Sequence, residues 1–390
     1  MPMPDFIVVG LGAVGSAVAH QLARRGARVR GIDRFHPPHD QGSSHGRTRI
    51  TRLAVGEGAD YVPLVQRSHL LWQALHAEVG GAPLLRRTGG VVIASPAADA
   101  GAFHGRAGFF ARTVALARQF GIAHEILDAA AVRERWPQFL LQPDEQAYFE
   151  PGAGVLAPEA CVRAQLVAAA RHGAELSYGE QVLAIATEGA GVRVHTDRGT
   201  RHAAQLVLTA GPWIPDLAGP HFAARLTVRR QVLQWFRTST PARYADACCP
   251  VYIWLHGPQA SDAMYGFPLG DGVAGVKVAT EQVAHGTDPE AVERRVAADE
   301  LRAAYDDHVR GRLAGVDPVA VASATCLYTS TVDGHFIIER DPDLPAVTVV
   351  SACSGHGFKH SAGLGEALAQ QLLGEVPAVS LAPFGLPPQG

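Results

Sequence analysis

The first hydrophobic pattern in the chain lies close to its start. An apolar run at positions 6–9 is too short for a helix and predicts a buried strand. Positions 13–25 contain strong helix formers with apolar residues on one face, so a helix is expected to end at Gly26. Positions 28–32 predict a second short strand, which places Asp33 at its C-terminal tip. The chain therefore opens with a strand, a glycine-rich turn, a helix and a strand.

The later pattern predicts elements of two kinds. Segments with helical periodicity or good helix formers are separated by short segments that predict strands. These short segments are either apolar throughout or switch between apolar and polar residues. We expect helices at 61–80, 101–135 (mainly helical), 158–172, 289–314 and from SGHGFKHSAG to about 373, and strands at 84–95, 182–186, 192–196, 205–208, 335–339 and 346–350.

The pattern of hydrophobic and polar residues changes between residues 225 and 285. Strands there alternate with Gly, Pro and Asp turns and no helix intervenes, which indicates an antiparallel sheet. We therefore predict an α/β fold in which a Rossmann-type dinucleotide-binding domain carries an inserted antiparallel-sheet substrate domain, with the site in the cleft between them. The expected ranges are 1–85, 150–222 and 320–390 for the first domain, and 86–149 and 223–319 for the second.

The glycine-rich turn has the spacing of a dinucleotide-binding motif. Gly10 permits the tight turn, Gly12 lets the backbone approach a pyrophosphate, and Gly15 lets the helix pack on the strand. The helix N-terminus supplies unpaired N–H groups to the phosphates. Asp33 follows 18 residues after Gly15 and can accept hydrogen bonds from an adenosine ribose. The glycine spacing by itself is only weak evidence for dinucleotide binding. Together with the surrounding strand, helix and aspartate, it makes dinucleotide binding the favoured interpretation.

The composition of the chain disfavours several kinds of binding partner and site. The 390 residues are 47% hydrophobic and carry a net charge of −3, with a pI near 6.6, so no nucleic acid or anionic membrane partner is expected. The cysteine number is odd and no CxxC spacing occurs, which disfavours a disulfide framework or a zinc site. The first strand begins by residue 6 and no apolar run has membrane-spanning length, so we expect a cytoplasmic protein. The cysteines are Cys161, Cys248, Cys249, Cys326 and Cys353.

Two basic features could carry chemistry. The loop SSHGRTRITR contains His45, Arg49 and Arg52, which could meet an anionic ring or a substrate carboxylate, or could form a solvated basic loop. Its place beside the dinucleotide motif favours function. Lys277 lies in the apolar strand GVKVAT and is either an edge residue or a pocket residue with a pKa lowered by desolvation.

A second glycine motif, SGHGFK, precedes the last helix. Gly355 and Gly357 allow the backbone to approach a ring closely, and Lys359 could reach a carboxylate or point to water. His356 and His360 are four residues apart, but further metal ligands are not evident, so no metal site is expected. Cys326 by itself indicates only a small buried side chain.

Taken in order, these motifs resemble the monomeric sarcosine oxidase and N-methyltryptophan oxidase family of D-amino-acid-oxidase-like flavoenzymes. The resemblance covers nearly the whole chain, and it is carried by GLGAVGSA, IDRFHPPH, GSSHGRTRITR, GEGADYVPL, TAGPW, YGFP, GVKV, TCLYT, DGHFIIER and SGHGFK.

The resemblance implies FAD as the cofactor of a Rossmann-type FAD-binding domain. It implies a thioether between Cys326 and the flavin, assisted by His45 and Arg49, and oxygen activation by Lys277. Arg52 and Lys359 are expected to clamp the substrate carboxylate. Tyr265 and Tyr328 are expected to form the walls of the amine pocket. The other implied cofactor contacts are Gly10, Gly12, Gly15, Asp33, Arg34, Ser43, Ser44, Val182, Gly211, Gly355 and Gly357.

By the same resemblance, the chain is expected to oxidise secondary, N-methylated amino acids to imines and to reduce O2 to H2O2, as a monomer. Alternatives are a cyclic imino-acid oxidase acting on pipecolate or proline, a flavin dehydrogenase that avoids O2, and a non-catalytic FAD-binding subunit. The chain differs from the family it resembles at two positions. Glu281 stands where similar sarcosine oxidases carry a histidine, which favours a cationic or larger amino acid over sarcosine. His45 stands alone where relatives often have two adjacent histidines.

Overall fold

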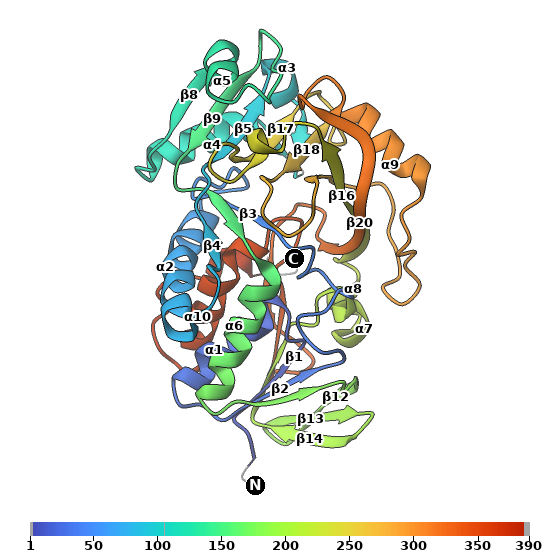
Figure 1. The fold of residues 1–390 in the computed structure, drawn as a ribbon. Coiled ribbons are helices and arrows are strands. Elements are labelled where there is room, and N and C mark those ends of the chain that lie inside the picture. Colours follow the sequence, from blue (N-terminus) through green and yellow to red (C-terminus); the bar gives the residue numbers. More distant parts are fainter. Residues whose placement is uncertain (1–2, 105, 386–390) are drawn as a thin grey trace.

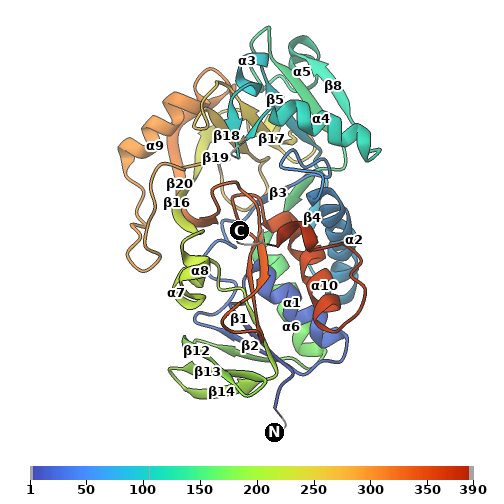
Figure 2. The ribbon, with the colours of Figure 1, turned by 180° about the vertical axis from the view of Figure 1, so that it is seen from behind.

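The computed structural model describes residues 3–104 and 106–385 of the chain. The molecule has two parts, which lie one above the other in Figure 1. The lower part contains the first strand and most of the long helices, and the upper part contains a large curved sheet. The chain passes between the two parts several times, so that blue, green and red segments meet in the lower part (Figure 2).

A six-stranded sheet forms the centre of the lower part, in the order β11-β2-β1-β15-β22-β21. Its strands are parallel except for the edge strand β21. Both faces are covered, which explains the fully apolar run of β1. Phe6 and Val8 pack with residues of α1, whereas Ile7 and Val9 pack with residues of β13. The strands are β1 (Phe6–Val9), β2 (Val29–Asp33), β11 (Glu175–Tyr178), β15 (Gln205–Leu208), β21 (Ile337–Arg340) and β22 (Val347–Ser351).

Helices cover one face of this sheet, and a small antiparallel sheet covers the other. Helices α1, α2, α6 and α10 lie together beside the sheet in both views (Figures 1 and 2). The helices are α1 (Ala13–Arg24), α2 (Tyr61–Val79), α6 (Pro158–Arg171) and α10 (Ser361–Leu372), and the small sheet is β12 (Val182–Glu188), β13 (Gly191–Thr196) and β14 (Gly199–Ala203). The short helices α7 (Ile214–Leu217) and α8 (Gly219–Ala223) follow β15.

An eight-stranded sheet forms the upper part, in the order β20-β16-β19-β18-β17-β5-β9-β8. All pairs are antiparallel except β17 with β5, which are parallel. The strands are β5 (Gly90–Ala94), β8 (Glu125–Asp128), β9 (Gln146–Glu150), β16 (Thr227–Thr238), β17 (Val251–Leu255), β18 (Ala263–Gly266), β19 (Val276–Thr280) and β20 (Val316–Ser330). Around it lie α3 (Pro96–Asp99), α4 (Phe109–Gln119), α5 (Ala129–Arg135), α9 (Ala298–Ala304) and the hairpin β6 (Ala102–Phe103) and β7 (Arg106–Ala107).

A small three-stranded sheet, β3-β10-β4, lies between the two parts. Its strands are β3 (Arg49–Thr51), β4 (Leu85–Arg86) and β10 (Gly154–Leu156). The expected α/β class, with a Rossmann-type sheet and a largely antiparallel second sheet, is confirmed. The division into domains stays a proposal. Since β20 pairs with β16 along most of its length, the boundary is better placed after residue 330 than at 320. Residues 1–2, 105 and 386–390 of the expected ranges lie outside the described residues.

Two of the expected helical stretches are wrong in part. Residues 101–135 contain the β6–β7 hairpin and strand β8 as well as two helices, because β8 completes the edge of the large sheet beside β9. In 289–314, only α9 and a π-turn at Tyr305–Val309 are helical. Arg230 donates hydrogen bonds to the carbonyl groups of Glu293 and Arg295, so tertiary contacts satisfy backbone groups that a helix would have used.

No helix in the described part of the chain combines the length and the apolar character that crossing a lipid bilayer requires.

Candidate active site

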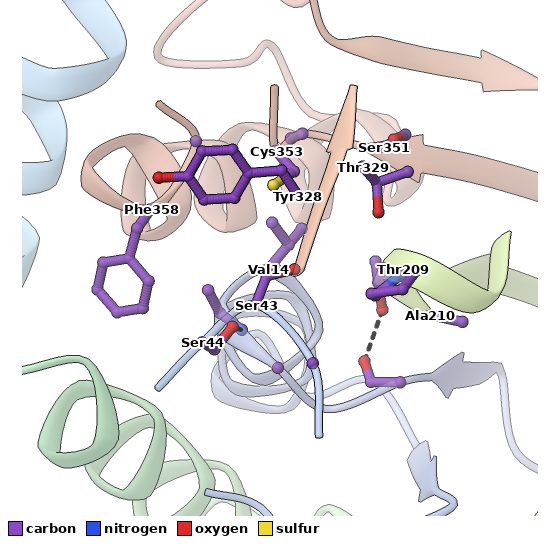
Figure 3. Close-up of a pocket in the computed structure, with 18 of the residues that line it drawn as sticks. Val14, Ser43, Ser44, Thr209, Ala210, Tyr328, Thr329, Ser351, Cys353 and Phe358 are labelled. Carbon is purple, nitrogen blue, oxygen red and sulfur yellow. Dashed lines mark hydrogen bonds between the residues drawn. The ribbon is translucent and has the colours of Figure 1, made fainter. Parts of the chain in front are cut away.

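One large cavity lies between the two parts of the molecule, lined by residues from both. Figure 3 shows Val14, Ser43 and Ser44 approaching it from the N-terminal segments, and Tyr328 and Thr329 from the opposite side. Most of the residues expected from the sequence line this cavity. They are Gly10, Gly12, Asp33, Arg34, Ser43, Ser44, Arg49, Arg52, Val182, Gly211, Tyr265, Glu281, Tyr328, Gly355, Gly357 and Lys359.

The turn between β1 and α1 forms one end of the cavity. Gly10 has a φ of +85°, and a Cβ there would lie 2.7 Å from the backbone of Ala210. Gly15 faces inward instead, where a Cβ would lie 1.8 Å from the carbonyl oxygen of Gly10. Only glycine fits these two positions, since α1 packs directly on the turn. The geometry matches the roles predicted for both residues.

Asp33 organises this turn from the end of β2. Its Oδ2 accepts a hydrogen bond from the N–H of Leu11 (2.7 Å), and its Oδ1 accepts one from the N–H of Phe35 (2.8 Å). The side chain is buried but lines the cavity. A carboxylate has about four acceptor positions, so Asp33 retains capacity for a ligand hydroxyl.

The residues at this end suit a dinucleotide. Gly12 caps α1 without a side-chain hydrogen bond, which leaves the helix N-terminus accessible to an anion. Ser44 Oγ accepts a hydrogen bond from the N–H of Ala13 (3.0 Å). Ser43 Oγ is buried at the cavity wall and has no hydrogen-bond partner among the described residues. Such an orphaned hydroxyl indicates a missing polar ligand. The glycines, the helix N-terminus and this hydroxyl therefore fit FAD.

Arg34 extends the same end toward the surface. Its guanidinium pairs with Glu290, which also accepts a hydrogen bond from Trp213 Nε1 (2.6 Å). Val182 and Gly211 line the cavity nearby. The irregular segment around Glu290 thus lies against the rim of the cavity and holds Arg34 in place.

Buried charges form the other end of the cavity. The guanidinium of Arg52 donates to both carboxylate oxygens of Glu57, at 2.9 and 2.7 Å. Lys359 Nζ lies 3.7 Å from Glu57 Oε1 and donates to the carbonyl of His356 at 2.8 Å. Burial would raise the pKa of Glu57, but Arg52 and Lys359 hold it well below its usual range. Two cations from distant segments therefore converge on one carboxylate.

His104, at the tip of the β6–β7 hairpin, links Glu57 to Glu281. Its Nε2 donates to Glu281 Oε1 at 2.5 Å, and its Nδ1 lies 3.2 Å from Glu57 Oε1. Burial opposes protonation, but Glu281 and Glu57 raise the pKa of His104 to about 9. At neutral pH the two carboxylates therefore flank an imidazolium. Glu281, expected to favour a cationic or larger substrate, is therefore already paired with a cation of the chain itself.

Tyr265 and Tyr328 form a wall beside Glu281. Their hydroxyl oxygens lie 3.0 Å apart, and burial raises the pKa of both, to about 12 for Tyr265. Gly355 faces them with a φ of +78°, and a Cβ there would lie 2.8 Å from Glu281 Oε1 and 3.1 Å from the ring of Tyr328. A side chain at position 355 would therefore obstruct the cavity.

The segment 42–49 forms part of the cavity wall, and Lys277 lies behind it. Lys277 is fully buried in the middle of the large sheet, so it is not an edge residue. Its Nζ donates to the carbonyl of Gly46 (2.5 Å) and to Thr48 Oγ1 (2.9 Å). Burial, reinforced by the charge of Arg49, lowers the pKa of Lys277 well below its usual value.

Cys326 contacts the same segment. Its Sγ lies 3.6 Å from the carbonyl oxygen of Ser43 and 3.5 Å from the guanidinium of Arg49. Burial raises the pKa of the Cys326 thiol, although Arg49 opposes that effect. His45 is also buried, and desolvation lowers its pKa to about 4. Lys277, His45 and Cys326 are thus brought together around one segment, but they do not line the cavity, and neither does Gly15.

The sequence interpretation missed two residues of the charged end. Glu57 lies five positions after Arg52, within the motif GEGADYVPL. This motif supports the resemblance, but no role was predicted for Glu57. His104 lies in a stretch expected to be helical, where nothing in the pattern indicated a cavity residue. By contrast, His356 and His360 take part in aromatic packing with Tyr61 and Phe336. They do not belong to the group of possible metal ligands found among the described residues.

Comparison with known proteins gives a consistent result. The DAO family, described as FAD dependent oxidoreductase, matches residues 5–371. The chain is 38% identical over 377 residues to a monomeric sarcosine oxidase from Streptomyces avermitilis, covering 95% of this chain and 94% of the relative. It is 34% identical over 366 residues to an N-methyl-L-tryptophan oxidase from Yersinia pestis, covering 94% of each.

Among solved structures, NikD, an unusual amino acid oxidase essential for nikkomycin biosynthesis, superposes with a TM-score of 0.82 at 24% identity. That match covers 99% of this chain and 98% of the other. At this identity the likeness concerns the fold.

Proposed function

The chain belongs to the DAO family of FAD-dependent oxidoreductases and is an FAD-dependent amino-acid oxidase acting on CH–NH donors, and from this premise we propose that it oxidises secondary, N-methylated amino acids, with H2O2 as the second product. Its relatives named for sarcosine and N-methyl-L-tryptophan support that substrate class.

The observation that carries the proposal is the convergence of Arg52 and Lys359 on one carboxylate, that of Glu57, at the charged end of the cavity. An arginine fork and a lysine ammonium are the groups that bind a carboxylate most strongly. In this proposal the substrate carboxylate takes over part of the interaction that Glu57 now occupies. The amino acid is thereby held at one end and its amine is directed toward Tyr265, Tyr328 and the Gly355 turn.

FAD, when bound, would accept the two electrons that the substrate loses when its C–N single bond becomes the C=N bond of an imine. The contribution of the chain is orientation. Binding energy from the carboxylate positions the amine so that few geometries other than the reactive one remain. Tyr265 and Tyr328 stay protonated across the neutral range and can donate or accept hydrogen bonds at their hydroxyl oxygens without changing charge.

We assign Lys277 to the oxygen half of the reaction. Its Nζ is buried behind residues 46–48, and burial lowers its pKa well below the ordinary value, so that it gives up a proton more readily than an exposed lysine. Cys326, which lies in β20 beside Arg49, is proposed as the covalent attachment point of the flavin. Arg49 favours the thiolate that such a bond requires.

The pairing of Glu281 with His104 modifies the expected specificity. A lone carboxylate would favour a cationic side chain, but His104 already neutralises Glu281. We therefore propose that Glu281 accepts a hydrogen bond from the substrate N–H and that the preferred substrate is larger than sarcosine rather than cationic. Ile50, Phe103 and Ile253 supply apolar wall for such a side chain.

The test is a screen of N-methylated, cyclic and primary amino acids with the purified holoenzyme, which measures flavin bleaching without O2 and peroxide formed per turnover with O2. We expect the flavin to bleach with bulky N-methyl amino acids and one peroxide to form per turnover. Faster turnover of pipecolate or proline than of any N-methyl amino acid would favour the cyclic imino-acid alternative. Bleaching without peroxide would identify a dehydrogenase, and turnover of sarcosine as fast as any bulkier substrate would refute the size preference.

A further inference from the structure

Three residues far apart in the sequence meet where the C-terminal halves of three helices come together, outside the cavity wall. His20 lies in α1, Glu78 in the last turn of α2, and His172 caps the C-terminus of α6. Helix α6 packs against both α1 and α2, in the group of helices beside the six-stranded sheet (Figures 1 and 2). None of the three residues lines the large cavity. The cluster is therefore separate from the amino-acid oxidase site.

The geometry of the cluster suits a small ion. His172 Nε2 lies 3.1 Å from Glu78 Oε1, and His20 Nε2 lies 3.9 Å from Glu78 Oε2. One atom from each residue falls within 4.8 Å of the other two. Around a zinc ion with bonds of about 2.0–2.1 Å, tetrahedral ligands are about 3.3 Å apart. The observed separations need only a modest contraction, which the partly exposed side chains of Glu78 and His172 permit.

His20 supplies an independent indication. It is 3% exposed, and its Nε2 is buried without a hydrogen-bond partner among the described residues. The carboxylate of Glu78 faces it from a distance too long for a hydrogen bond. An unpaired buried nitrogen is costly, and an ion placed between the nitrogen and the carboxylate would satisfy both.

The local charges permit a cation. A metal ligand must be a neutral imidazole, and the burial of His20 disfavours its protonated form. Arg24 and Arg25 lie near this imidazole and weaken the attraction for a cation. Arg25 is itself paired with Glu366 and Glu375, and Glu78 adds a negative charge inside the cluster.

We propose that His20, Glu78 and His172 bind one divalent late transition-metal ion, such as Zn²⁺, with water completing the coordination on the exposed side. Two imidazoles and one carboxylate suit Zn²⁺, Ni²⁺ or Cu²⁺, whereas Mg²⁺ and Ca²⁺ prefer oxygen ligands. The ion would tie α1, α2 and α6 together. Because α1 carries the dinucleotide-binding turn at its other end, the ion would stabilise the layer that supports the cofactor.

The experiment is a calorimetric titration of the chelator-treated holoenzyme with Zn²⁺, accompanied by thermal unfolding with and without the ion. We expect one ion to bind, the unfolding midpoint to rise and Mg²⁺ to have no effect. His172→Gln and Glu78→Gln change partly exposed side chains, and each should weaken Zn²⁺ binding at least tenfold. His202→Gln is the matched control, since His202 also pairs with a glutamate, Glu188, on an exposed strand.

Equal Zn²⁺ affinity in the wild type, His172→Gln and Glu78→Gln would overturn the proposal, as would the absence of binding. Loss of binding in His202→Gln would assign the ion to a different site and would also overturn it. The proposal does not depend on the substrate, so its failure would leave the oxidase function unaffected.

Discussion

The two ends of the cavity are built in different ways. The dinucleotide end includes the turn between β1 and α1, with its glycines and short polar side chains, and many of its lining residues lie between positions 9 and 44. The charged end consists of buried charges from separate segments, including Arg52, Glu57, His104, Glu281 and Lys359. The first end depends on close packing, and the second on charges that must balance one another in a medium of low dielectric constant. Substitutions should therefore affect the two ends in different ways.

The largest effect is expected at the turn between β1 and α1. Gly15→Ala would place a Cβ 1.8 Å from the Gly10 carbonyl oxygen, so α1 would have to move away from the sheet. We expect loss of soluble protein or of FAD, measured by flavin absorbance and circular dichroism. Gly12→Ala is the control, because its Cβ meets only the Ser44 hydroxyl, at 3.2 Å. Gly12→Ala should fold yet bind FAD at least tenfold more weakly, and a stable, yellow Gly15→Ala would contradict the packing argument.

At the charged end, removing one member of a buried ion pair should destabilise the fold more than removing both members. Arg52→Gln leaves Glu57 buried with reduced compensation, which should cost about 3–5 kcal/mol of unfolding free energy. It should also reduce kcat/KM by about 100-fold or more, because the fork for the substrate carboxylate is lost. Adding Glu57→Gln should restore much of the stability and little of the activity. Denaturant unfolding and steady-state kinetics would measure both, and full recovery of kcat/KM in the double variant would rule out Arg52 as the carboxylate clamp.

A smaller effect is expected at the thiol behind the cavity wall. Cys326→Ser preserves the shape of the side chain, so the fold should be retained, but acid precipitation should release the flavin. Cys353→Ser is the matched control, since Cys353 lines the cavity whereas Cys326 does not. Flavin that stays with the precipitated wild-type and Cys353→Ser polypeptides identifies Cys326 as the attachment point. If Cys353→Ser is the variant that releases the flavin, the assignment is wrong.

The smallest expected effect is a dependence of the folding stability on pH. The pKa of His104 rises from its ordinary value of 6.5 to about 9 in the folded protein. The stability that its protonation contributes is therefore fully present below pH 6.5 and is lost as the pH rises toward 9. We expect the midpoint of thermal unfolding to fall by a few degrees across that window in the wild type and by less in His104→Gln. Parallel pH profiles for the two proteins would show that His104 is not charged in the folded state.

Lys359 offers a separate pH signal at the same end. Burial lowers its pKa to about 8, against the opposing charge of Glu57. Above that pH the clamp loses a positive charge, so KM should rise as Lys359 deprotonates. Lys359→Arg, which stays charged, should remove this rise.

The sequence by itself determined the dinucleotide end. Strand, turn, helix, second strand and Asp33 are consecutive, and their interactions are mostly local, so spacing was enough to predict them. It also pointed to Arg52 and Lys359, the proposed clamp, because both lie in motifs that carry the family resemblance, and the structure brings both to Glu57. The expected helices at 101–135 and 289–314 failed in part where backbone groups bond to distant segments instead of to their own turn.

Only the tertiary structure decided how the charges meet. Glu57 and His104 are 47 positions apart, and Glu281 lies far beyond both, yet one imidazole joins the two carboxylates. Likewise, the sequence could not tell whether Lys277 faced solvent or the interior, whereas its position within the large sheet buries it. Local patterns report short-range backbone preferences, but whether a charge is paired depends on which distant segments the fold brings within a few ångströms of it.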